Sequence, residues 1–262
     1  MTDILKYEAR RHLLGVVALT VMLGLFVLLI LSLYPSIAAT GPAIEELFRN
    51  LPEQFTASFA VEAYTTVEGF LASEFYQFMW LLLAGLYVVY LAGGIVADDV
   101  ESGRIDLLLA TPVSRRRVVV EKYLSLFVPI VVLNLVIPLF VYAGLLTIGE
   151  SIDVQRIVLL HLFSIPYLAV VGALGLLLSV LVDRADIAQR GGLAVLFVLF
   201  VLDSVTTDTD FEWLGTLSPT RYFDPTAILV DGDVDLAGAL LLVAAAVLLV
   251  LVSAQIFKES DV

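Results

Sequence analysis

The chain has 262 residues, of which 60% are hydrophobic and only 16% charged, and its formal net charge is −13. Its mean hydropathy of +1.01 lies well above the value that a soluble domain needs to fill one core, which excludes a soluble fold and predicts a protein of the lipid bilayer. The sequence holds no cysteine, so disulfides and thiolate metal sites are excluded as well.

Six apolar segments are predicted to cross the membrane as helices. The hydrocarbon core is about 30 Å thick and a helix rises about 1.5 Å per residue, so roughly 20 apolar residues are needed. The fifth segment is short, because a charged residue, Asp203, follows 12 uncharged ones and is costly at mid-membrane. We expect an all-α integral membrane protein with spans at about 13–34, 75–97, 123–147, 157–182, 191–206 and 236–257.

The residues ahead of the first span predict a short amphipathic helix. Ile4, Leu5, Ala9 and Leu13 lean to one side of such a helix, and the charged side chains lie elsewhere. This pattern is typical of a helix in the cytoplasmic interface, although a frayed polar tail is the alternative. The 22 apolar residues that follow exceed the usual 7–15 of a signal peptide, so we expect the first span to remain as an anchor.

The segment between the first two spans, residues 35–74, is predicted to be an outer loop. It is long for an unstructured connection and contains alternating apolar and acidic positions. One or two short helices lying along the outer membrane surface would account for this pattern.

The segment 98–122, between the second and third spans, carries five basic residues, yet apolar side chains at Ile105 and 107–109 interrupt its charges. An apolar ridge on a cytoplasmic loop either packs against the helix ends or contacts a partner. Thr111 suits a helix N-cap and Pro112 the first position of a helix, so the segment predicts a helix, a break and a second helix.

Three polar residues of the later spans have open roles. Asn134 either lines a transport pathway or forms a hydrogen bond with a neighbouring helix, and the second alternative is the more common one. His161 is more typical of hydrogen-bonded packing than of a metal ligand. The role of Asp203 is left open. Pro129, Pro138 and Pro166 predict kinks, because proline removes a backbone donor.

The distribution of charge predicts the orientation. With six spans and both termini in the cytoplasm, the inner segments hold 11 Lys and Arg residues and the outer segments hold three. The outer segments also hold 16 acidic residues, so the whole net charge lies outside. A salty exterior explains this acidic surface more simply than attraction of a cationic substrate does, and a halophilic host remains a hypothesis.

Motifs of catalysis are missing from the sequence. There is no phosphate-binding GxxxxGK[ST] loop, no HExxH and no GxSxG, and the chain has only two histidines. We therefore expect no enzyme activity, no catalytic residue and no cofactor or metal site in this chain.

The stretch ESGRIDLLLATPVSRRRVVVEK resembles the cytoplasmic signature of ABC-2 type transporter permeases, and the stretches EGFLASEFYQFMWLLL and LSPTRYFDPTAIL extend the resemblance over most of the chain. The general pattern is similar to that of six-span permeases such as the copper-site maturation permease of nitrous oxide reductase. The acidic outer loops depart from that pattern, which leaves the substrate open.

The resemblance implies that residues 1–262 form one permease domain in the plasma membrane, more typical of export than of import. It implies a second permease, either another copy or a paralogue, and two separate cytoplasmic ATPases that bind ATP and Mg²⁺; no nucleic acid is expected. It also implies that 98–122 supplies a coupling helix. The expected ATPase-coupling residues are Glu101, Gly103, Arg104, Leu107, Leu108, Leu109, Thr111, Pro112, Ser114, Arg115 and Lys122.

Two other functions stay open from the sequence. An ion-coupled secondary transporter would show inverted repeats and charges at mid-membrane, and neither is evident. A non-transporting scaffold or signalling partner is the second alternative. An ATPase encoded by a neighbouring gene would favour the transporter.

Overall fold

The computed structural model describes residues 2–49, 66–207 and 209–260, and within these ranges the chain is helical or irregular and forms no strand. Six helices are long and apolar enough to cross a membrane, which confirms the predicted all-α membrane fold and its six spans. They cover Arg10–Thr40, Val67–Glu101, Arg115–Ile148, Val154–Leu181, Ala185–Thr206 and Leu236–Glu259.

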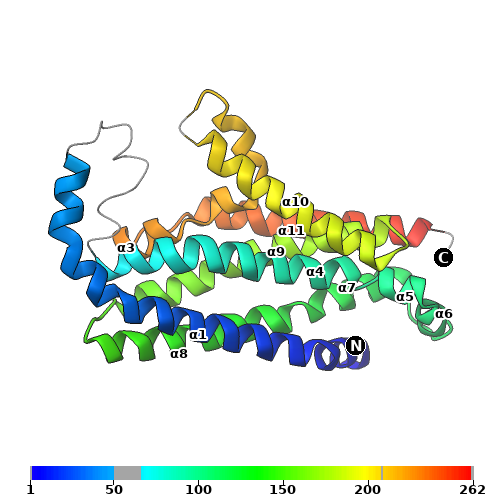
Figure 1. The fold of residues 1–262 in the computed structure, drawn as a ribbon. Coiled ribbons are helices and arrows are strands. Elements are labelled where there is room, and N and C mark those ends of the chain that lie inside the picture. Colours follow the sequence, from blue (N-terminus) through cyan, green and yellow to red (C-terminus); the bar gives the residue numbers. More distant parts are fainter. Residues whose placement is uncertain (1, 50–65, 208, 261–262) are drawn as a thin grey trace.

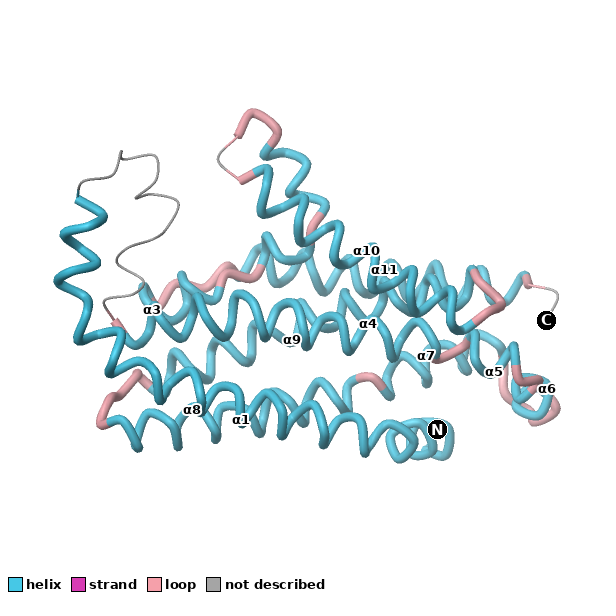
Figure 2. The backbone as a smooth tube through the Cα atoms, in the orientation of Figure 1, coloured by secondary structure: helices cyan, strands magenta, loops and turns pink. Residues whose placement is uncertain are grey.

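Most helices lie side by side along one direction, as Figure 1 shows. The first, α1, runs without interruption over Thr2–Arg49. The N-terminal residues are therefore helical, as predicted, but they belong to α1 and are not a separate element. Its first turns are seen almost end-on beside the N-terminus in Figures 1 and 2, so they run at an angle to the rest of the helix.

The second span is built from four consecutive pieces. These are α3 (Val67–Leu71), the π-helix η2 (Ala72–Ala84), α4 (Gly85–Gly94) and α5 (Ala97–Glu101). The predicted outer loop is thus shorter than expected, because α1 continues to Arg49 and the second span begins at Val67. The end of an apolar run marks where a helix leaves the hydrocarbon, not where its backbone hydrogen bonds end. Short helices predicted within 50–65 lie outside the described residues.

The segment after the second span is a helix, a break and a helix, as predicted: α6 (Arg104–Leu109) precedes α7 (Arg115–Ser125). The predicted N-cap was wrong. Ser114 Oγ accepts the N–H of Arg117 at 3.3 Å and so caps α7, whereas the Thr111 hydroxyl donates to the Leu108 carbonyl at 2.6 Å and closes α6. Pro112 lies in the break between the two helices.

The third span continues as α8 (Phe127–Ile148). A one-residue turn at Leu126 separates α7 from α8, near Pro129, which has no N–H to offer the carbonyl of the preceding turn. Pro138 and Pro166 lie inside helices that remain continuous in their secondary structure.

The remaining spans are α9 (Val154–Leu181), α10 (Ala185–Thr206) and α11 (Leu236–Glu259). Between the last two, the 3₁₀ turns η3 (Glu212–Leu217) and η4 (Pro219–Tyr222) and the short π-helix η5 (Ala227–Asp231) form the outer connection. Short turns interrupt the second span at residues 95–96 and the third span at Leu126, and Figure 2 shows the latter as a short loop between α7 and α8.

Candidate functional site

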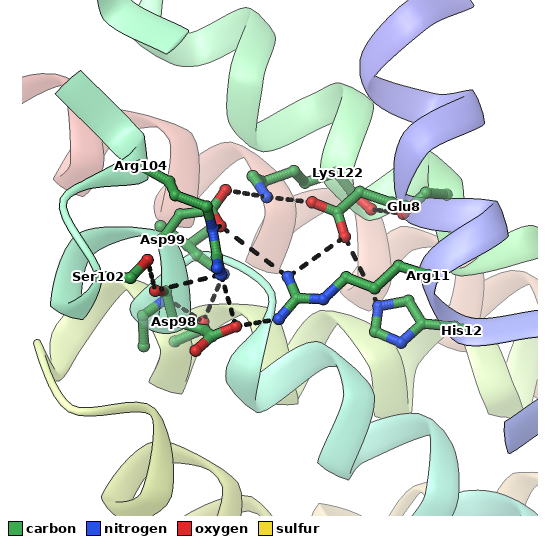
Figure 3. Close-up of polar contacts among 12 residues, drawn as sticks. Glu8, Arg11, His12, Asp98, Asp99, Ser102, Arg104 and Lys122 are labelled. Atoms are coloured by element: carbon green, nitrogen blue, oxygen red, sulfur yellow. Dashed lines mark hydrogen bonds and ion pairs between the residues drawn. The ribbon is translucent and has the colours of Figure 1, made fainter. Parts of the chain in front are cut away.

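Three charged side chains are buried together at the inner end of the molecule, the end predicted to face the cytoplasm. Glu8 of α1, Asp99 of α5 and Lys122 of α7 are 1%, 3% and 0% exposed. Lys122 Nζ lies 2.5 Å from Glu8 Oε1 and 2.7 Å from Asp99 Oδ2. Figure 3 shows Lys122 between the two carboxylates. Burying an ion is costly unless it is paired, so these contacts hold three helices to one another.

Two arginines surround this buried group. Arg104, at the start of α6, donates from Nε to Asp99 Oδ1 at 2.9 Å and from Nη2 to Asp98 Oδ2 at 2.8 Å. Arg11 of α1 forms an ion pair with Asp98 and lies 3.8 Å from Glu8 and 3.9 Å from Asp99. We name this set of three acids and three bases the charge junction: Glu8, Arg11, Asp98, Asp99, Arg104 and Lys122.

The electrostatics of the charge junction favour the ionised form of Glu8. Burial by itself raises the pKa of Glu8, but His12 and the charges of Lys122 and Arg11 outweigh burial and lower the pKa to about 2. The hydrogen bond to Asp99 raises the pKa of Arg104. The formal charges of the three acids and the three bases cancel within the charge junction.

Helix α6 stands at the surface beside the charge junction. It begins after Gly103, whose φ of +69° lies in the left-handed region that glycine adopts without strain. Ile105 is buried and anchors α6, while Leu107 is 74% exposed. Next to it lies a groove of about 310 Å³, between α1 and α6. Its lining residues are Ile4, Tyr7, Glu8, Asp99, Arg104, Leu107 and Leu108.

The inner segment, which we define as residues 97–125, is attached to the fourth, fifth and sixth spans. Ser179 Oγ of α9 accepts the N–H groups of Val96 and Ala97, both at 2.9 Å. Glu101 Oε2 accepts the first N–H of α10, from Ala185, at 2.9 Å. The guanidinium of Arg115 donates to the carbonyl of Ser260, just beyond α11, at 2.6 Å. Together with the charge junction, these contacts connect the inner segment to every other span.

The residues expected to couple to an ATPase occupy three kinds of position. Gly103, Leu107, Thr111, Pro112 and Ser114 are exposed. Others are partly buried and packed: Arg104, Leu108, Leu109 and Arg115. Glu101 is also exposed, but its carboxylate binds the N-terminus of α10, and Lys122 is fully buried.

The position expected for Lys122 is therefore corrected. A side chain without exposed surface has no contact to offer a partner, and its ammonium group is used by Glu8 and Asp99. Sequence reasoning missed the roles of Glu8, Arg11 and Asp99. One feature of the sequence could have indicated these pairs: each of the first three spans has a charged residue beside its inner end. Charged side chains at the same depth in the membrane can pair when their helices are neighbours.

Asn134 lies away from the charge junction, in a buried chain of hydrogen bonds between α8, α9 and η2. Its Oδ1 accepts from Ser164 Oγ at 2.6 Å and lies 3.1 Å from His161 Nδ1, which therefore carries the proton. His161 Nε2 is left to accept the hydroxyl of Tyr76 at 2.9 Å. This geometry agrees with the packing alternative for both Asn134 and His161.

Asp203 lies near the outer end of α10. It accepts the Thr220 hydroxyl at 2.6 Å and lies 3.6 Å from Arg221 Nη1, so it joins α10 to η4. Among the described residues, no group of three or more His, Cys, Asp or Glu side chains could hold a metal ion.

Comparison with known proteins gives one family. No curated protein matches the chain. The family model described as ABC-2 family transporter protein matches residues 8–262. The matched range contains the stretch 101–122 that carries the resemblance and also the charge junction, and it confirms that resemblance. The chain belongs to the ABC-2 family of transporter proteins.

Proposed function

We propose that the chain is the membrane-spanning subunit of an ABC exporter, and that a separate cytoplasmic ATPase drives it by docking on α6. Membership of the ABC-2 family supports a permease. The single observation that carries the docking site is the exposed Leu107 beside an apolar groove, on a segment that is connected to every other span. The excess of basic residues predicted at this end supports its cytoplasmic position.

The α6 surface has the features of a protein contact. Leu107 and the groove offer apolar surface that gains free energy when a partner excludes water from it. The exposed Thr111 and Pro112 follow at the edge. Because Ile105 fixes α6 from below, a partner that moves Leu107 moves the whole helix.

The charge junction gives that movement a path into the membrane. Arg104 at the start of α6 holds Asp98 and Asp99, and Asp99 shares Lys122 with Glu8. Removing one partner of a buried ion pair typically costs about 3–5 kcal/mol, so α1, α5 and α7, which meet at Lys122, move together more readily than they part. The half-exposed Arg104 links α6 to this group. A partner changes the conformation only through its different affinity for two states, and ATP-driven closure of the ATPases would supply that difference.

Three further parts of the proposal rest on the family. A second permease, either another copy or a paralogue, completes the pathway, ATP and Mg²⁺ bind the partner ATPases, and the direction is outward. The family match supports a transporter assembly, and these three parts are proposals within it.

Co-purification tests the docking site. The tagged chain, extracted in mild detergent, is expected to bring with it an ATPase that carries a phosphate-binding loop. Leu107→Asp should abolish this association and leave insertion intact, because a charge on an exposed side chain disturbs the interface and not the fold. Leu181→Asp is the matched control, since Leu181 is 55% exposed but lies on α9 outside the groove. An ATPase retained by Leu107→Asp would exclude docking at α6.

A further inference from the structure

The inner half of α10 packs against α4 at the close distance that glycine permits. A Cβ atom added to Gly93 would lie 3.0 Å from the Cα of Gln189, and one added to Gly192 would lie 3.0 Å from Val89 Cγ2. Small residues at such a contact let two helices approach closely. The contact therefore holds α10 against α4 near its inner end, and a tilt of α10 would turn about this point.

The outer half of α10 leaves the other helices. Figure 1 shows it diverging from α4, α9 and α11 towards the connection that precedes η3. None of residues 197–205 is buried, and Val198 and Val205 are 61% and 69% exposed. Within this half, the ring of Phe200 meets that of Phe78 at a centroid distance of 6.0 Å. Residues 197–205 therefore pack little against α4, α9 and α11, and the outer half is held mainly at its end.

The inner end of α10 is held by the segment that leads to α6. The N-cap residue, Arg184, makes no capping bond with its side chain, and the first amide of α10 is bound by Glu101 Oε2 instead. A carboxylate at this place satisfies an orphan donor and complements the helix dipole. Beside it, Ala97 packs against Ala185 and Ala188 in a small apolar cluster.

The outer end of α10 is attached to the outer turns through Asp203. This carboxylate accepts the Thr220 hydroxyl and lies close to the guanidinium of Arg221, both on η4. It also lies against η3, because a Cβ atom on Gly215 would be 2.9 Å from Asp203 Oδ1. A change in the direction of α10 would therefore pull on both outer turns.

We propose that α10 is a lever which transmits movement of the inner segment to the outer face, with Glu101 as its input, the glycine contact as its pivot and Asp203 as its output. From Ala185 to Gly192 the helix measures about 10 Å, and from Gly192 to Thr206 about 21 Å. A displacement at the inner end is thus about doubled at the outer end when α10 tilts as a rigid body. The lever rests on the proposed function only for the source of the movement.

Spin labels test the lever in the isolated chain. The chain has no cysteine, so Val205→Cys and Leu146→Cys, two exposed positions on α10 and α8, give one clean pair in lipid nanodiscs. Glu101→Ala should shift or broaden the distance distribution between these labels by about 2 Å or more, because it releases the inner end. Asp106→Ala, an exposed acid of α6, is the matched control.

Hydrogen exchange tests the same lever in reverse. Coupling between two sites is reciprocal, so Asp203→Asn should accelerate exchange of the Ala185 amide by about threefold or more. The lever is refuted if Glu101→Ala leaves the label distances unchanged, if Asp106→Ala changes them equally, or if Asp203→Asn leaves the amide unaffected. Neither readout needs an ATPase, so a negative result here leaves the docking proposal intact, and failed co-purification leaves the lever intact.

Discussion

Replacing Lys122 with methionine removes the positive charge that lies closest to Glu8 and, with Arg104, closest to Asp99. Lys122 Nζ lies 2.5 Å from Glu8 Oε1 and 2.7 Å from Asp99 Oδ2, and its side chain has no exposed surface. Methionine has a similar volume, so the change in packing is small and the electrostatic change dominates. Removing one partner of a buried ion pair typically costs about 3–5 kcal/mol, because the other charge stays buried without compensation.

The geometry says which carboxylate bears this cost. After the substitution Asp99 keeps Arg104 Nε at 2.9 Å, whereas Glu8 keeps only Arg11 at 3.8 Å and His12 at 3.6 Å. We therefore expect Glu8 to account for most of the lost stability. The second substitution Glu8→Gln should recover more than half of the loss in the Lys122→Met background, and Asp99→Asn should recover less.

Thermal unfolding of the purified chain in mild detergent measures this series. A loss of about 3–5 kcal/mol in a protein of this size corresponds to a fall in Tm of roughly 6 to 20 °C. Circular dichroism follows it, since the fold is helical. A Tm within about 2 °C of wild type for Lys122→Met would refute the reasoning that the buried charges hold these helices together. Better recovery with Asp99→Asn than with Glu8→Gln would refute the assignment of the cost to Glu8.

Three other predictions concern single residues. The folded state lowers the pKa of Glu8 to about 2 from its ordinary value of 4.5, so the ionised carboxylate stabilises the fold above pH 4.5 and this stabilisation is lost as the pH falls towards 2. The difference in unfolding free energy between wild type and Glu8→Gln should therefore shrink by about 3 kcal/mol over that window, which Tm measured at several pH values tests. Gly103→Ala should cost about 1–2 kcal/mol because of its positive φ, and Gly103→Asn should cost less, since asparagine adopts this conformation more readily; equal losses of Tm would contradict this explanation. Asn134→Leu leaves the Nδ1–H of His161 without its acceptor, while Ser164 keeps the His161 carbonyl at 3.0 Å, and it should cost about 1–3 kcal/mol, yet leave transport-coupled ATPase activity within a few-fold of wild type; loss of that activity at normal stability would instead place Asn134 in a pathway.

The spans were predictable because the bilayer imposes a simple rule on the sequence. A long apolar run with basic residues at one end has few alternatives, and all six predicted spans occur in the structure. Their ends were not predictable from the same rule. Helices such as α7 and α10 begin several residues before their apolar run, since caps and not lipid decide where a helix starts.

The charge junction was beyond sequence reasoning for a different reason. Glu8 and Lys122 are separated by 114 positions in the chain, and each by itself is an ordinary charge at a membrane edge. Their pairing depends on which helices are neighbours, and an apolar run does not encode its neighbour. In the same way, Glu101 and Arg115 were expected at a partner surface, and the structure shows their polar groups bound to α10 and to the residue beyond α11.

Site-directed cross-linking at Leu107 tests the central claim most directly, because the chain has no native cysteine. A photoreactive maleimide on Leu107→Cys, in native membranes, should yield a cross-linked product that contains an ATPase with a phosphate-binding loop. The same reagent on Leu181→Cys should yield little of it. The proposal that α6 is the docking site would be contradicted if position 107 cross-linked only to lipid or to this chain. It would be contradicted equally if position 181 captured the ATPase as well as position 107 does.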